Sequence, residues 1–128
     1  MALTELYVDP SIAADSGAGT IGDPYGDLEY CLEQEDYDLT NGIRVNIKAG
    51  TDEVVAAELS VAMASTAAPG KSVAWVPTQA APCVFQGYTT AAGDGGKGGI
   101  SGGGSVSIYS DTALDFVHFV DLQQHHLL

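Results

Sequence analysis

The sequence predicts an all-β fold, for three reasons. Beyond Gly50, apolar runs of about five residues alternate with clusters of Gly, Pro, Ser and Ala, a pattern typical of a sandwich, a barrel or a solenoid. The sixteen glycines imply many turns. Asn41-Gly42 follows a predicted helix, so no Asn-Gly dipeptide joins two adjacent strand candidates. The missing hairpin signal favours parallel coils over an antiparallel meander.

An N-terminal cap is predicted over residues 1–40. Leu3–Val8 is a candidate first strand that ends at Asp9-Pro10, and the small and polar residues 11–22 are expected to form a surface loop. A helix laid beside the first strand would cover backbone groups that an edge strand leaves unpaired. We therefore expect this segment to close the first end of the fold.

The helix of the cap is expected over about residues 24–35. Asp23 can cap its first turn, and Pro24 suits the first helical position because its missing amide hydrogen would go unpaired there. Tyr25, Leu28 and Leu32 share one face at helical spacing.

About two coils are predicted over residues 41–128, which complete a single domain. Ile43, Val45 and Ile47 alternate with polar residues, which indicates a strand with one buried face. The later strand candidates are Val54–Met63, Ser72–Val76, Cys83–Tyr88, Ser105–Tyr109 and Phe116–Leu122. Val54–Met63 would also suit a helix. The glycine-rich Gly93–Gly104 is expected to be a loop between coils.

The charge balance excludes two classes of partner. Seventeen acidic residues against four basic ones give a net charge of −13. Binding a polyanion requires clustered Lys and Arg, and the four basic residues of this chain are scattered singly. We therefore expect neither nucleic acid nor an anionic membrane surface as a partner.

The cysteines and the N-terminus favour a cytoplasmic origin. MALTELYVDP has neither the positive start nor the apolar block of a secretory signal. Cys31 and Cys83 are expected to be buried free thiols, with a disulfide between them as the alternative.

Two segments of the sequence resemble a known family. LYVDPSIAADSGAGTIGDPYGDLEYCLEQ and IRVNIKAGT are similar to the N-terminal entry of right-handed parallel β-helix proteins, the pectate-lyase-like superfamily. The matching residues are Tyr7, Val8, Pro10, Asp15, Gly19, Thr20, Pro24, Tyr25, Leu28 and Ala49-Gly50-Thr51. The resemblance implies a short right-handed parallel β-helix behind a capping strand and helix. The superfamily includes lyases, hydrolases, phage tailspikes, adhesins and inert structural modules.

The chain departs from that family in length, because members usually stack many more coils than two. The last candidate strand is apolar on both faces, which makes it a poor terminal edge. Either the native chain continues beyond Leu128 or a neighbouring subunit covers this end. The candidate interface residues are Phe116, Val117, Phe119, Val120 and Leu122.

We expect no catalytic, cofactor or metal site. The lyases of the family use calcium-binding aspartates with a basic residue, and no such set can be mapped onto this chain; Arg44 is interpreted as a surface ion-pair partner. His125 and His126 are neighbours that point oppositely on an extended chain, so they cannot easily share one ion. Trp75, Tyr88 and Tyr109 are the candidate residues for stacking on a glycan.

The leading expectation is a non-enzymatic structural module of an assembly. The resemblance suggests a virion component of a phage, such as a capsid decoration or cement protein or the base of a spike or fibre, with a homotrimer as the default oligomer. One alternative is the N-terminal fragment of a longer carbohydrate-active β-helix enzyme, a polysaccharide lyase or a glycoside hydrolase. Another is a glycan-binding adhesin module.

Overall fold

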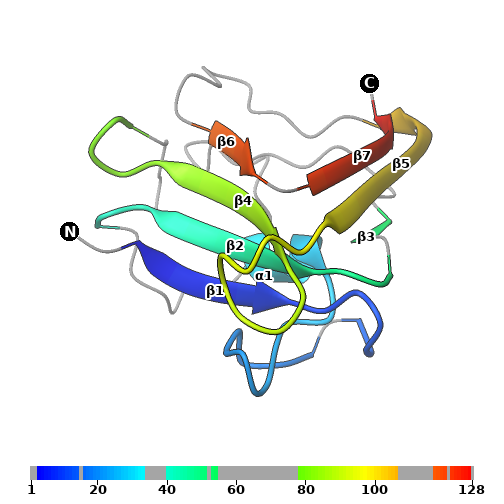
Figure 1. Ribbon diagram of the computed structural model, residues 1–128, viewed down its shortest axis with the longest axis horizontal. Helices are drawn as coiled ribbons and strands as arrows, with labels where there is room; N and C mark the ends of the chain where they lie inside the picture. The colour runs from blue at the N-terminus through cyan, green and yellow to red at the C-terminus, as the bar shows by residue number, and fades with distance from the viewer. Residues whose placement is uncertain are drawn as a thin grey trace.

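The computed structural model describes residues 3–14, 16–33, 40–51, 53–54, 78–106, 117–120 and 122–127. Within these ranges the chain is rich in strands and contains one short helix (Figure 1). The elements in order are β1 (Thr4–Val8), α1 (Leu28–Glu33), β2 (Ile43–Lys48), β3 (Glu53–Val54), β4 (Cys83–Tyr88), β5 (Gly98–Val106), β6 (Val117–Val120) and β7 (Leu122–Leu127).

The strands form two sheets in which every described pair is parallel. One sheet has the order β1-β2-β4-β6 and the other the order β3-β5-β7. Figure 1 shows the first sheet rising from β1 to β6, with the second sheet beside its upper strands. The all-β class and the parallel pairing predicted from the missing hairpin signals are confirmed for this part of the chain.

One face of the four-stranded sheet forms the core. Because side chains alternate along a strand, every second residue of β1, β2 and β4 points to the same side. These inward residues are buried, together with three residues of the cap and helix. They are Leu6, Val8, Ile43, Val45, Ile47, Cys83, Phe85, Tyr25, Leu28 and Cys31.

Two strands lie where the alternation of the sequence predicts them. The strand around Ile43, Val45 and Ile47 is β2, and the candidate Cys83–Tyr88 is β4, with the same bounds. The first strand begins one residue later than predicted, at Thr4. Alternation is reliable here because only one face of each strand is apolar.

The helix is shorter than predicted and begins later. Asp27, not Asp23, caps it: the Tyr30 N–H donates to Asp27 Oδ1 at 2.5 Å. Tyr25 cannot be helical because its backbone pairs with β1, where its N–H donates to the Tyr7 carbonyl at 2.8 Å and its carbonyl accepts from the Asp9 N–H at 2.8 Å. Tyr25 and Leu28 are both buried, as predicted, although only Leu28 lies in the helix.

The glycine-rich segment is a strand for most of its length, which corrects the prediction of a loop. β5 begins at Gly98 and pairs with β3 on one side and β7 on the other. Gly98 and Gly99 are buried opposite Leu122 and Gln123. Pairing on both sides supplies the hydrogen bonds that outweigh the low strand propensity of glycine. The loop itself is confined to residues 89–97.

Several predicted strands lie partly or wholly outside the described residues. These are Ser72–Val76, all of Val54–Met63 except Val54, the last three residues of Ser105–Tyr109, and Phe116. The last strand candidate is divided into β6 and the start of β7, and β7 continues through His125 and His126 beyond the predicted end.

Candidate functional site

The outer edge of β1 is closed by the chain itself. Tyr7 presents its backbone groups away from β2, and both are used: its N–H donates to the Gly19 carbonyl at 3.0 Å, and its carbonyl accepts from the Tyr25 N–H at 2.8 Å. The Asp9 N–H continues this pairing to the Tyr25 carbonyl. Figure 1 shows the segment of residues 16–26 folded below β1. We call residues 16–26 the cap loop.

Glycines make this close approach possible. Gly17 and Gly19 have φ angles of +94° and +84°, which L-residues with side chains rarely adopt. A Cβ atom at Gly19 would lie 2.5 Å from the ring of Tyr25. The cap loop can therefore lie against β1 only with glycine at this position.

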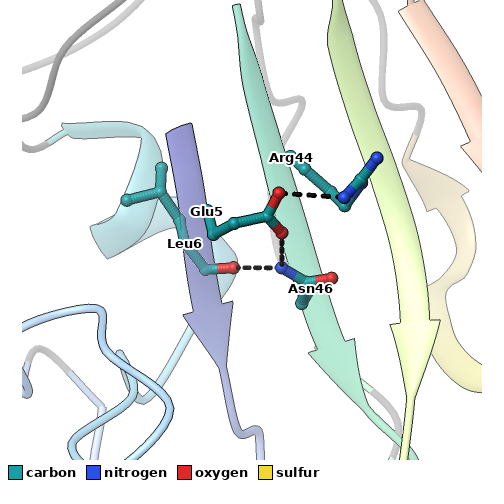
Figure 2. A network of polar contacts seen from close by, with 4 residues as sticks. All are labelled: Glu5, Leu6, Arg44 and Asn46. Atoms are coloured by element: carbon teal, nitrogen blue, oxygen red, sulfur yellow. Dashed lines mark hydrogen bonds and ion pairs between the residues drawn. The ribbon is translucent and has the colours of Figure 1, made fainter. Parts of the chain in front are cut away.

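A polar network joins β1 to β2 on the outer face of the sheet (Figure 2). The Glu5 carboxylate accepts from Arg44 Nη1 at 2.9 Å and from Asn46 Nδ2 at 3.0 Å. Asn46 Nδ2 also donates to the Leu6 carbonyl at 3.0 Å. The interpretation of Arg44 as an ion-pair partner is confirmed, and its partner is Glu5.

Asn46 is fully buried although it belongs to the outer face. Its neighbours in register are Tyr7 on β1 and Gln86 on β4. Asn46 Oδ1 and Arg44 Nε are buried atoms without a hydrogen-bond partner among the described residues. The network fixes β1 against β2, and its Asn46 side chain is buried out of reach of solvent.

The tyrosine pair lies beside this network. Tyr7 and Tyr88 meet edge to face, with 5.4 Å between ring centroids and 83° between ring planes. Tyr88 is only 2% exposed, and burial together with the nearby Asp9 and Asp94 carboxylates raises its pKa to about 12. Its phenol is therefore neutral at physiological pH, and its ring is not free for the glycan stacking considered from the sequence.

A single carboxylate organises the loop of residues 89–97. Asp94 accepts the N–H groups of Thr89, Thr90, Ala91 and Gly96 at distances of 2.7–3.3 Å. These four donors hold the pKa of Asp94 well below its usual range. Asp94 acts as the internal anchor of the turn. These hydrogen bonds explain why an acidic residue lies between the two glycines of this turn.

A second ion pair lies at the end of β1. Lys48 Nζ is 3.7 Å from Asp9 Oδ2, and Asp9 Oδ1 accepts from both the N–H and the hydroxyl of Ser11. Burial raises the pKa of Asp9, but the Ser11 hydrogen bonds and Lys48 outweigh it, so the net shift is downward. Asp9 is thus a structural carboxylate that ties the end of β1 to β2.

The last strands differ from the first. β6 is the final strand of one sheet and β7 is the final strand of the other, and a single residue separates them in the sequence. Among the described residues each has a partner strand on one side only. On β6, the side chains of His118 and Val120 are exposed, Val120 by 40%. We call β6 and β7 together the terminal edge.

The predicted interface residues fall on the terminal edge in part. Val117 and Phe119 lie in register with the buried Cys83 and Phe85. Val120 is exposed on the opposite face, and Leu122 begins β7. Phe116 lies outside the described residues, as do Trp75 and Tyr109 of the predicted glycan-stacking set.

Neither cysteine is suited to nucleophilic chemistry. Cys31 and Cys83 are buried thiols that form no disulfide, as predicted, and burial raises the pKa of Cys83, which keeps it protonated and unreactive. Within the described ranges no group of His, Cys, Asp and Glu could hold a metal ion. No described helix has the length and apolar character needed to cross a membrane.

The sequence did not identify three of the residues that organise these regions. Asn46 stands among polar residues of an alternating strand, and nothing marks it as buried. Glu5 could have been paired with Arg44 only once the parallel register of β1 and β2 was known. Asp94 lies within Gly93-Asp94-Gly95, a turn signal that could have indicated its role.

Comparison with protein-family models, curated proteins and solved structures found no match for this chain.

Proposed function

We propose that this chain is a non-enzymatic structural module of a protein assembly. The observation that carries the proposal is the terminal edge, where two sheets end together and Val120 is exposed. Strand edges with an exposed apolar residue favour pairing with another chain. The resemblance to parallel β-helix proteins makes a virion component, such as a capsid decoration protein or the base of a spike or fibre, the assembly that we favour.

The finer fold that we propose is a short right-handed parallel β-helix. Three features support it. Successive strands of the first sheet begin 39, 40 and 34 residues apart (4 to 43, 43 to 83 and 83 to 117). After each of β2, β4 and β6 the chain enters the second sheet, at β3, β5 and β7. All described pairs of strands within the two sheets are parallel, as coils stacked in one direction require.

The polar residues of the described surface suit a structural role. Glu5, Arg44 and Asn46 are engaged with one another, and Asp94 is saturated by backbone donors. Glycan binding has less support, because Tyr88 is buried against Tyr7. The net charge of −13 keeps separate copies soluble and would favour contact with a basic surface on a shell.

Light scattering on the purified chain at micromolar concentration tests this proposal. A structural module should form a defined particle of several copies, and the resemblance makes three times the chain mass of 13.2 kDa the default. A monomer at all concentrations would contradict the proposed assembly. Release of reducing or unsaturated sugars from polysaccharides, abolished by heat denaturation, would instead favour the carbohydrate-active alternative.

A further inference from the structure

We infer that the terminal edge pairs with the terminal edge of a second copy about a two-fold axis. The inference uses the same edge that supports the proposed assembly role, and it adds the partner and the symmetry. It starts from the difference between the two ends of the sheets, which Figure 1 places at opposite sides of the molecule.

The outer edge of β1 is already occupied at Tyr7 and Asp9. The backbone groups of Tyr7 that point away from β2 are bonded to Gly19 and Tyr25, and the Asp9 N–H is also bonded to Tyr25. A second copy that stacked head to tail would have to place its β1 against the β6 of the first copy. The cap loop occupies that position. Head-to-tail stacking, which would give an open filament, is therefore blocked.

With that contact blocked, we take the terminal edge of a second copy as the partner of β6. Contact between two identical edges is isologous and generates a closed two-fold assembly. The two-fold axis reverses one chain relative to the other, so β6 would pair with its counterpart in the antiparallel sense. Antiparallel pairing is compatible with the hydrogen-bonding edge of a parallel sheet and occurs at the edges of mixed sheets.

The charge distribution favours the same partner. Residues 4–33, which form the first end, contain seven acidic residues and no Lys or Arg. Residues 117–127, VHFVDLQQHHL, contain one acidic residue, Asp121, and all three histidines of the chain. Two copies that meet at their terminal edges bring together the less acidic of their two ends and keep the more acidic first ends apart. A strongly basic partner would gain little electrostatic energy at this edge.

The exposed side chain of Val120 provides the apolar contact. It is 40% exposed on the outer face of β6, next to exposed His118. Natural edge strands that stay unpaired often carry a lysine at such a position, because its charge opposes strand addition. Val120 has no such effect, so a lysine introduced there should prevent the pairing.

The experiment compares Val120→Lys with Ile12→Lys by light scattering. Ile12 is also 40% exposed but lies in the loop after β1, so it is a matched control for added charge. We expect a particle with an even number of copies. This particle is a dimer, or a hexamer if the chain also forms a trimer through another face. Val120→Lys should halve its mass, and Ile12→Lys should leave it unchanged. An odd number of copies, or a mass that Val120→Lys does not change, would overturn the inference.

A second measurement holds even if Val120→Lys destabilises the fold. Val120→Cys should be joined into covalent dimers by a short bis-maleimide linker, because Cys31 and Cys83 are buried and do not compete. Ile12→Cys should remain uncoupled under the same conditions. Equal coupling of the two variants would overturn the inference. A trimer that is insensitive to both changes at Val120 would leave the structural role standing and remove only the two-fold contact.

Discussion

The two ends of the four-stranded sheet deal with unpaired backbone groups in different ways. At β1, residues 16–26 fold back against the strand, and the backbone groups of Gly19 and Tyr25 form hydrogen bonds with those of Tyr7 and Asp9. At β6, the described residues place the exposed His118 and Val120 on a strand that is paired on one side. The β1 edge is covered by neighbouring residues of the same chain, and the β6 edge is suited to pairing with a partner chain.

The closed end depends on a few residues with special demands. The cap loop needs glycine where φ is positive and where a ring comes close, and it needs Tyr25 as a buried side chain. The terminal edge makes no comparable demand, because extended backbone accepts most residues. We therefore expect substitutions at the first end to change stability, and substitutions at the last end to change association.

The largest effect is expected from Tyr25→Ala. Tyr25 is 3% exposed and meets Tyr30 edge to face with 5.7 Å between ring centroids. Removing a buried aromatic side chain costs about 3–5 kcal/mol of unfolding free energy. Urea unfolding should show this loss as a lower midpoint. Because the cap loop would then be held less firmly, Tyr25→Ala should also increase self-association through β1.

Tyr30→Ala is the matched control, since Tyr30 loses the same ring contact but is only partly buried. We expect a loss of about 1 kcal/mol and no change in association. An equal loss of unfolding free energy in Tyr30→Ala and Tyr25→Ala would mean that the contact between the two rings holds the cap loop, and that burial of Tyr25 does not.

A smaller loss is expected from Gly19→Ala, about 1–3 kcal/mol. At this position a positive φ and the collision with the Tyr25 ring act together. Gly50 has a φ of +110° with no atom near the added Cβ, so Gly50→Ala should cost about 1 kcal/mol from the backbone alone. Gly22 has neither constraint, and Gly22→Ala should be neutral. Thermal unfolding of the three variants should give this order. Equal losses at Gly19 and Gly50 would show that the approach to Tyr25 is unimportant.

The smallest effect is expected for the ion pair between β1 and β2. Both side chains of the Glu5–Arg44 pair are about one third exposed, 35% and 34%, so their coupling should be about 0.2–1 kcal/mol. A double-mutant cycle with Glu5→Gln and Arg44→Met measures it, and Gln at position 5 can still accept from Asn46. The coupling should shrink as salt is raised to about 1 M. A coupling that salt leaves unchanged would mean that the pair acts mainly by packing.

The sequence predicts those parts of the fold in which the residue pattern fits only one kind of secondary structure. The alternation in Ile43–Lys48 and Cys83–Tyr88 determines both strand bounds and buried faces. The helix start could not be predicted, because helical spacing at Tyr25 competes with a backbone pairing to Tyr7 that lies 18 residues away (7 to 25). The Gly98–Val106 strand was missed for a similar reason, since its hydrogen bonds come from β3 and β7 and not from any local preference. At the terminal edge, the sequence identifies the apolar residues. The face of the sheet on which Val120 lies could be assigned only from the register of β6 with β4.

The closure of the first end also has a consequence for the order of folding. The cap loop contacts Tyr7 across 12 and 18 residues (7 to 19 and 7 to 25), whereas the paired strands of the four-stranded sheet begin 34–40 residues apart. Closing a short loop costs less entropy and occurs sooner than pairing distant strands. The cap loop and β1 are also synthesised before β2, β4 and β6. We therefore expect β1 with its cap loop to form a template on which β2, β4 and β6 are added in turn, so that the sheet grows in one direction and its last strand is the last to fold.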